Sequence, residues 1–158
     1  MLLKLENISK SYSKERMILD QLSLEINAGE RVAIVGPSGS GKTTLLNLIG
    51  TLDRPDSGKM IFDGQDLSAM NDNELAQFRN RKIGFVFQMH HLLPQLSLWE
   101  NVLLPTLTDP ALQGKETEDR AKRLIERVGL SGVVSQKPSE LSGGECQRTA
   151  VVRALINR

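Results

Sequence analysis

Gly36-Pro37-Ser38-Gly39-Ser40-Gly41-Lys42-Thr43 is a glycine-rich octapeptide that matches the pattern G-x-x-x-x-G-K-[ST] at every fixed position. An uninterrupted apolar run, residues 32–35, precedes it, and residues 42–49 follow with apolar side chains at helical spacing. Glycines let backbone N–H groups turn towards one centre without interference from Cβ atoms. A helix that begins at Lys42 would add the positive end of its dipole at the same point. The octapeptide therefore predicts a loop that binds phosphate groups.

The side chains of this loop indicate how a nucleotide would be held. Lys42 is expected to reach the β- and γ-phosphates of a nucleotide, and the Thr43 hydroxyl is expected to bind Mg²⁺. The candidate nucleotide-binding residues are residues 36–43 together with Thr44, and Lys42 is also a candidate catalytic residue. The loop alone does not distinguish kinases, GTPases, helicases and transporters. The alternative is a glycine-rich turn that precedes a helix by chance. Four fixed positions make such a match arise in about one sequence of this length in a few hundred.

The segments around the loop predict an α/β protein. Alternating apolar residues predict strands in the first part of the chain, and continuous apolar runs predict two strands that are buried on both faces. Capping boxes and an amphipathic pattern predict four further helices. The expected strands are residues 2–8, 22–26, 31–35, 59–62 and 83–87; the expected helices are residues 42–49, 71–81, 98–105, 116–128 and 142 onwards, with a surface loop at 106–115.

Composition excludes several classes of protein. The net charge is +1, from 20 basic and 19 acidic residues spread along the chain, so nucleic acid is not an expected partner. The single cysteine, Cys146, excludes an internal disulfide and fits a reducing compartment; its spacing from Ala150 predicts a packed, structural thiol. No apolar run approaches the ~18 residues that span a bilayer. A cytoplasmic location is expected, and work at a membrane would need a membrane partner.

A second motif, Leu141-Ser142-Gly143-Gly144-Glu145, opens the last predicted helix. The spacing of Ser142 and Glu145 is that of a capping box, so an ordinary helix start is one interpretation. Two adjacent glycines are poor helix formers, however, and their N–H groups are left available for an anion. The residues alone leave open whether this motif makes a second phosphate contact.

This motif resembles the LSGGQ signature of ABC ATPases, with Glu145 in place of glutamine. The resemblance implies a phosphate-loop core, an N-terminal antiparallel β subdomain (with the loop, about residues 1–88) and a helical signature subdomain (about 89–158). It implies that Tyr12 stacks on adenine and that Gln88 contacts Mg²⁺ and the attacking water. It also implies a head-to-tail dimer in which the signature residues Ser142, Gly143, Gly144 and Glu145 of one subunit face the γ-phosphate held by the other.

A narrower resemblance is to the lipoprotein-releasing and macrolide-export ATPases. It rests on residues 46–58 and 87–94 and on Trp99-Glu100-Asn101-Val102. It implies partners among ABC transporter membrane subunits, on the cytoplasmic face of the inner membrane, and cargo such as lipoproteins, peptides or drugs. The cell-division ATPase of the same branch remains an alternative. A nucleotide kinase is disfavoured by the signature motif, and a DNA-associated ABC ATPase by the near-neutral charge and the lack of a long coiled-coil insertion.

The family's next segment after the signature helix carries the Walker B aspartate and the catalytic glutamate. No apolar run followed by Asp-Glu occurs in these 158 residues. We therefore expect a truncated version of a longer ATPase that binds ATP, with an incomplete sheet whose two buried strands have unpaired edges. Hydrolysis needs those carboxylates, so a non-hydrolysing nucleotide-binding fragment is the alternative to a working ATPase.

Overall fold

The computed structural model describes residues 1–13 and 16–157. Contacts between Cα atoms divide the chain into two compact units, Met1–Gln77 and Phe78–Arg158, and each unit is described by itself. The subdomain boundary expected near residue 88 stays a prediction. Among the described residues, no helix has both the length and the apolar character needed to cross a bilayer.

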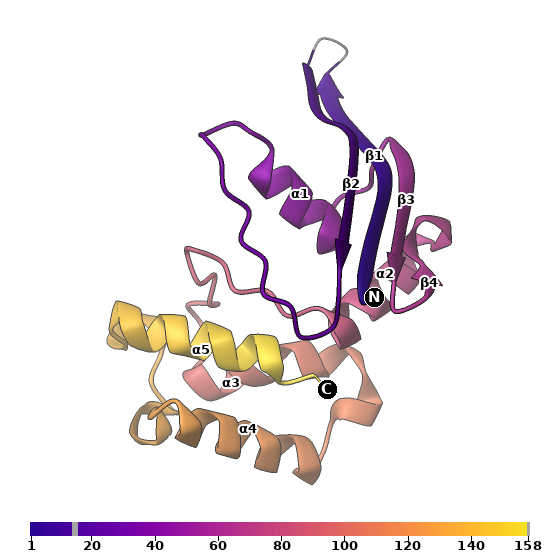
Figure 1. Cartoon of the computed structure of the whole chain (residues 1–158). Coiled ribbons are helices and arrows are strands. Elements are labelled where there is room, and N and C mark those ends of the chain that lie inside the picture. Colours follow the sequence, from indigo (N-terminus) through magenta and orange to yellow (C-terminus); the bar gives the residue numbers. More distant parts are fainter. Residues whose placement is uncertain (14–15, 158) are drawn as a thin grey trace. The chain divides into compact units, whose positions relative to one another are not determined.

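The first unit is built on an antiparallel sheet of four strands in the order β2-β1-β3-β4 (Figure 1). The strands are β1 (Leu3–Ser13), β2 (Arg16–Ile26), β3 (Ser57–Phe62) and the short β4 (Gln65–Asp66). Leu3 and Leu5 of β1 are buried, which fits the alternation that predicted this strand, and Ile8 is also buried because the strand register shifts between Leu5 and Ile8. The predicted antiparallel β subdomain is confirmed, and its first two strands are longer than predicted.

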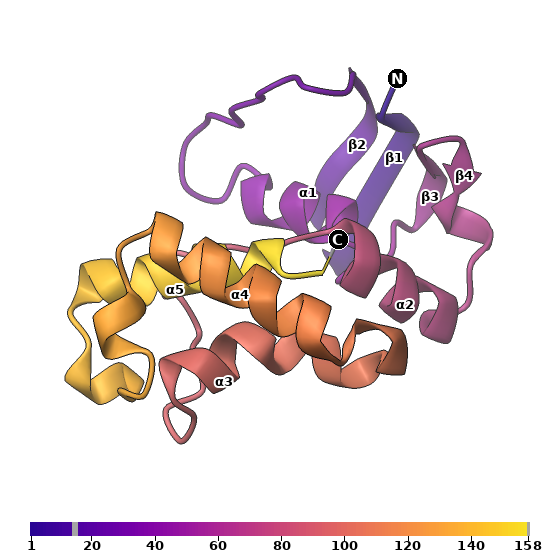
Figure 2. The same ribbon diagram turned by 90° about the horizontal axis from the view of Figure 1, so that it is seen from below.

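Helix α1 (Lys42–Ile49) begins and ends at the predicted residues. It buries Leu45 and Leu48, and Gly50 follows it as the C-cap, with its N–H bonded to the Leu46 carbonyl at 2.8 Å. Figures 1 and 2 show α1 lying against one face of the β1–β2 pair. The helix is therefore fixed to the sheet by its apolar side, with its N-terminus at the glycine-rich loop.

The two strands predicted from continuous apolar runs, residues 31–35 and 83–87, are wrong for this structure. Neither range forms a strand. Val35 is 87% exposed and Val32 is 53% exposed, so the first run is not buried either. A strand is held by hydrogen bonds to a neighbouring strand, and the described part of the chain supplies none beside these two runs. The sheet is accordingly open, as predicted, but it lacks these two strands.

Helix α2 (Asp72–Lys82) starts in the first unit and ends in the second. Its predicted capping box is present: the Asn71 side chain accepts the Glu74 N–H at 3.1 Å, and the Glu74 carboxylate accepts the Asn71 N–H at 2.8 Å.

The second unit is a cluster of three helices, α3 (Leu98–Leu103), α4 (Lys115–Arg127) and α5 (Gly143–Leu155) (Figure 2). Short 3₁₀ turns connect them, at Leu104–Thr108, Pro110–Leu112, Ser131–Val133 and Pro138–Glu140. The core between the helices is apolar, and its buried members are Leu98, Val102, Ala121, Ile125, Leu130, Val152 and Ile156. The predicted helical subdomain is confirmed as a packed unit with its own core.

Candidate nucleotide-binding site

The glycine-rich loop ends at Gly41, which caps α1 in a left-handed conformation with φ of 88°. A Cβ atom at Gly41 would lie 3.1 Å from the side chains of Ile18 and Leu19 in β2. Both the backbone conformation and the lack of space require glycine here. The loop is thus pressed against the sheet at the point where the helix begins.

The Lys42 side chain folds back over this loop. Its ammonium group donates hydrogen bonds to the carbonyl oxygens of Gly36 at 2.9 Å and Pro37 at 2.6 Å, with the Ser40 hydroxyl at 3.4 Å. A positive charge therefore sits among the backbone groups of the loop, which is where a bound phosphate would need it. The structure thus places the Lys42 charge within the loop.

The two threonines after Lys42 differ in exposure. Thr43 is exposed, whereas Thr44 is 8% exposed. A hydroxyl oxygen is a hard ligand of the kind that Mg²⁺ binds alongside phosphate oxygens. The Thr43 side chain therefore fits a Mg²⁺ ion carried by a nucleotide, and Thr44 can offer only its backbone N–H group from the first turn of the helix.

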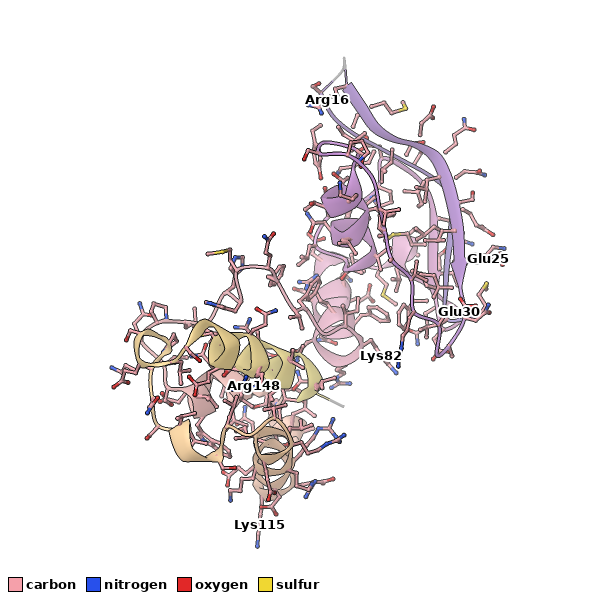
Figure 3. The ribbon with its side chains drawn as sticks, turned by 60° about the vertical axis from the view of Figure 1, so that its left-hand side comes forward. Arg16, Glu25, Glu30, Lys82, Lys115 and Arg148 are labelled. Carbon is pink, nitrogen blue, oxygen red and sulfur yellow. The ribbon has the colours of Figure 1, made fainter. Side chains whose placement is uncertain are left out.

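A second basic group approaches the loop and was missed from the sequence. A Cβ atom at Gly39 would lie 3.5 Å from Nη2 of Arg16, the first residue of β2, which Figure 3 labels. A single arginine at the start of a strand carries no sequence pattern that identifies it. In the structure it pairs with Ser13 of β1, and its side chain reaches Gly39 of the loop.

Tyr12, the residue expected to stack on adenine, lies near the end of β1 with 61% of its surface exposed. Its hydroxyl group donates a 2.8 Å hydrogen bond to Asp53, in the loop after α1. The Lys10 ammonium bonds the same carboxylate at 2.8 Å and lies over the Tyr12 ring, 5.2 Å from its centroid. The sequence alone did not identify Lys10 and Asp53 as part of this group. Asp53 lies 41 positions after Tyr12 and 43 positions after Lys10, and no local pattern connects residues so far apart.

Lys10 and Asp53 each stabilise the charged form of the other. Burial lowers the pKa of Lys10, but its hydrogen bond and attraction to Asp53 outweigh burial and raise that pKa above its ordinary value. Burial raises the pKa of Asp53, but hydrogen bonds from Lys10, Tyr12 and the Arg54 N–H outweigh it and lower that pKa. Both groups are therefore charged at neutral pH.

Gln88 belongs to the second unit and is exposed. The segment after it is held by the signature helix α5: Arg153 donates 2.7 Å hydrogen bonds to the carbonyl oxygens of His90 and His91. The His91 ring also stacks on Phe87, with centroids 4.9 Å apart. Residues on both sides of Gln88 are thus anchored, while the glutamine itself is accessible.

The signature motif forms the predicted helix start. The Ser142 hydroxyl accepts the Glu145 N–H at 3.3 Å, and the Glu145 carboxylate accepts both the Ser142 N–H and its hydroxyl at 2.7 Å. The hydrogen bond from the Ser142 hydroxyl, and to a smaller extent the one from its backbone N–H, lower the pKa of Glu145. A Cβ atom at Gly143 would meet nothing within 4 Å, so the first turn of α5 is open. Cys146 packs with Leu92 and Ala150, which confirms its structural placement.

The predicted site residues therefore fall into two groups. The first unit holds the loop residues 36–44 and Tyr12; the second holds Gln88 and the signature residues Ser142, Gly143, Gly144 and Glu145. A lysine-bearing glycine loop between a sheet and the N-terminus of a helix defines a phosphate-loop nucleotide-binding protein of the α/β class.

Comparison with known proteins places the chain within this class. The family model described as "ABC transporter" matches residues 19–158. A "Lipoprotein-releasing system ATP-binding protein LolD" of Bacteroides thetaiotaomicron is 51% identical over 156 residues, which cover 99% of this chain and 71% of that protein. The "Uncharacterized ABC transporter ATP-binding protein YknY" of Bacillus subtilis is 48% identical over 159 residues, covering 99% and 69%.

The fold is also similar to solved structures. A dimeric structure of the ATP-binding cassette MJ0796, in a post-hydrolysis state with ADP and Pi, superposes with a TM-score of 0.87 at 42% identity. The match covers 99% of this chain and 70% of that one. The chain belongs to the ABC transporter family, as the ATP-binding subunit, and by family it is an ATPase. The expected family and fold are confirmed.

Proposed function

We propose that this chain binds ATP together with Mg²⁺ through the glycine-rich loop. The observation that carries the proposal is the Lys42 ammonium, held within 2.9 Å of the Gly36 and Pro37 carbonyls at the start of α1. A triphosphate would draw this ammonium to its β- and γ-phosphates and would accept hydrogen bonds from backbone N–H groups of residues 38–44. Thr43 would bind the Mg²⁺ ion, and Lys42 would neutralise charge on the phosphates.

Tyr12, Gln88 and the signature residues complete the proposed site. The exposed Tyr12 ring would stack on adenine, and Gln88 would contact Mg²⁺ and the attacking water. Ser142, Gly143, Gly144 and Glu145 would face the γ-phosphate bound to a second copy, in a head-to-tail dimer. The open first turn of α5 supports this role, and the dimeric MJ0796 cassette offers a related assembly.

The membrane role is proposed from the relatives. Several that are about half identical bear the name "Lipoprotein-releasing system ATP-binding protein LolD", from Bacteroides, Porphyromonas and Pseudomonas species among others. We infer that the chain serves membrane subunits on the cytoplasmic face of an inner membrane and supports extraction of lipoproteins. Peptide or drug export is the second candidate, from the resemblance of residues 46–58 and 87–94 to macrolide-export ATPases; the Bacillus subtilis relatives YknY and YvrO are named only as uncharacterized ABC transporter proteins.

Nucleotide binding and the transported cargo are tested in separate experiments. For the site, ATP affinity is measured by titration calorimetry with Mg²⁺ and with EDTA, for the wild type and for Thr43→Val. We expect Mg²⁺ to tighten binding in the wild type and to have little effect in Thr43→Val; equal Mg²⁺ dependence in both proteins would refute the Thr43 role.

For the cargo, the chain is depleted in the cell that encodes it and the membranes are fractionated. Lipoproteins should then accumulate in the inner membrane. Normal lipoprotein sorting after depletion, with altered resistance to peptides or drugs, would favour the second candidate instead.

A further inference from the structure

We propose that Asp53 is a positioning residue for adenine recognition: together with Lys10 it holds the Tyr12 ring so that one face stays free to stack on the base. The inference rests on the proposed role of Tyr12. Asp53 would not contact the nucleotide, and it would act only through the orientation of the aromatic ring.

Two hydrogen bonds meet on the Asp53 carboxylate. One oxygen accepts the Tyr12 hydroxyl at 2.8 Å, and the other accepts the Lys10 ammonium at 2.8 Å. The same ammonium bonds the Arg54 carbonyl at 2.7 Å. Hydrogen bonds to charged groups are stronger and more directional than neutral ones, so the phenol is tied at its far end.

Lys10 lies over the Tyr12 ring. Its ammonium lies 5.2 Å from the Tyr12 centroid, within the range of a cation–π contact. Lys10 itself is 9% exposed, so this cation is fixed rather than free in solvent. Tyr12 is nevertheless 61% exposed, so much of its surface remains available to a flat partner. A ring held at its hydroxyl and on one face loses less freedom when a base stacks on it.

The β1 segment that carries Tyr12 is also connected to the phosphate loop. The loop after α1 is bonded to β1 at two further points: the Asp56 N–H donates to the Ser9 carbonyl at 2.9 Å, and the Ser11 N–H donates to the Asp56 carboxylate at 2.7 Å. On the other side of β1, Lys10 pairs with Leu19 of β2, whose side chain lies against Gly41.

The N-terminal end of α1 therefore lies against β2, the strand paired with β1, and the segment after its C-terminal end is bonded to β1 itself. The helix N-terminus presents the phosphate loop, and the segment after its C-terminus presents Asp53. This arrangement connects the Tyr12 ring and the phosphate loop through one set of contacts within the first unit. The base and the triphosphate can then be bound at once without reordering either element.

The test compares a ligand that has a base with one that lacks it. A fluorescent ATP analogue is bound to the full chain and displaced by ATP or by inorganic tripolyphosphate, in the wild type, Asp53→Ala, Tyr12→Ala and the double variant. Asp20→Ala is the matched control, because Asp20 is an exposed acidic residue of β2. Thermal unfolding of each variant is recorded in parallel.

We expect Asp53→Ala to weaken ATP binding about fivefold, the size of one lost hydrogen bond, and to leave tripolyphosphate binding within about twofold of the wild type. In the Tyr12→Ala background, Asp53→Ala should have no further effect on ATP affinity. Equal weakening of both ligands, unchanged ATP affinity, or an additive loss in the double variant would overturn the inference. If the wild type bound neither ligand, the proposed function itself would fail, so the two failures are distinguishable.

Discussion

Arg153 holds the backbone of His90: its Nη2 atom donates a 2.7 Å hydrogen bond to the His90 carbonyl oxygen. Its Nη1 atom makes a matching 2.7 Å bond to the carbonyl of His91, so one guanidinium clamps two successive peptide groups. Burial lowers the pKa of Arg153 without a compensating carboxylate, which indicates a charge held mainly by backbone oxygens. The clamp joins the signature helix α5 to the segment that follows Gln88.

Replacing Arg153 by methionine should loosen this segment. Two charged hydrogen bonds are lost, and the expected cost is about 2 kcal/mol in the free energy of unfolding of the second unit. Amides of residues 88–93 should exchange with deuterium at least about tenfold faster than in the wild type. Arg148→Met, at an exposed position of the same helix, is the control and should leave exchange unchanged. Identical exchange in the two variants would argue against the clamp.

Asn101 is fully buried, and its amide group is fully bonded. The Nδ2 atom lies 3.0–3.1 Å from the carbonyl oxygens of Leu93, Leu96 and Ser97, and Oδ1 accepts the Leu93 N–H at 2.7 Å. Asn101→Asp would set a carboxylate against three carbonyl oxygens, so we expect a loss of about 3 kcal/mol or more in urea unfolding at neutral pH. The exposed Asn73→Asp should change stability by less than about 0.5 kcal/mol. A small effect at residue 101 would mean that its bonds contribute little.

The depressed pKa of Asp53 predicts a defined pH dependence. Its folded pKa lies below the unfolded value of about 3.9, so the ionised carboxylate stabilises the first unit above that pH. This stabilisation is lost as pH falls through the folded pKa. The stability difference between wild type and Asp53→Asn, followed by urea unfolding from pH 7 to pH 3, should be constant near neutrality and shrink below about pH 4. A difference that does not change with pH would show that the Asp53 charge is unimportant.

Features set by neighbouring residues could be predicted from the sequence. The glycine loop and helix α1 follow from the order of glycine, lysine and apolar residues, and the capping boxes at Asn71, Ser97 and Ser142 follow from a three-residue spacing. In each case the partner groups lie within one helical turn, where geometry is dictated by local sequence. These elements begin within one residue of the predicted positions.

Features set by distant residues could not be predicted in the same way. Residues 31–35 and 83–87 have the apolar content of buried strands, but a strand exists only beside a partner, and in the described structure both runs lie outside the sheet. The contacts of Asp53 with Lys10 and Tyr12 are equally remote in sequence. Tertiary contacts determine both the missing strands and the bonds of Asp53, and neighbouring residues in a single sequence do not indicate such contacts.

The central claim is that residues 36–43 form a cradle for nucleotide polyphosphate that depends on the Lys42 ammonium. Photo-crosslinking to 8-azido-ATP, with and without excess ATP, tests it most directly in the wild type, Lys42→Ala and the control Lys115→Ala, at the exposed start of α4. We predict that the wild type and Lys115→Ala are labelled in a manner that ATP competes away, whereas folded Lys42→Ala is not labelled. Labelling of Lys42→Ala at the wild-type level would contradict the account.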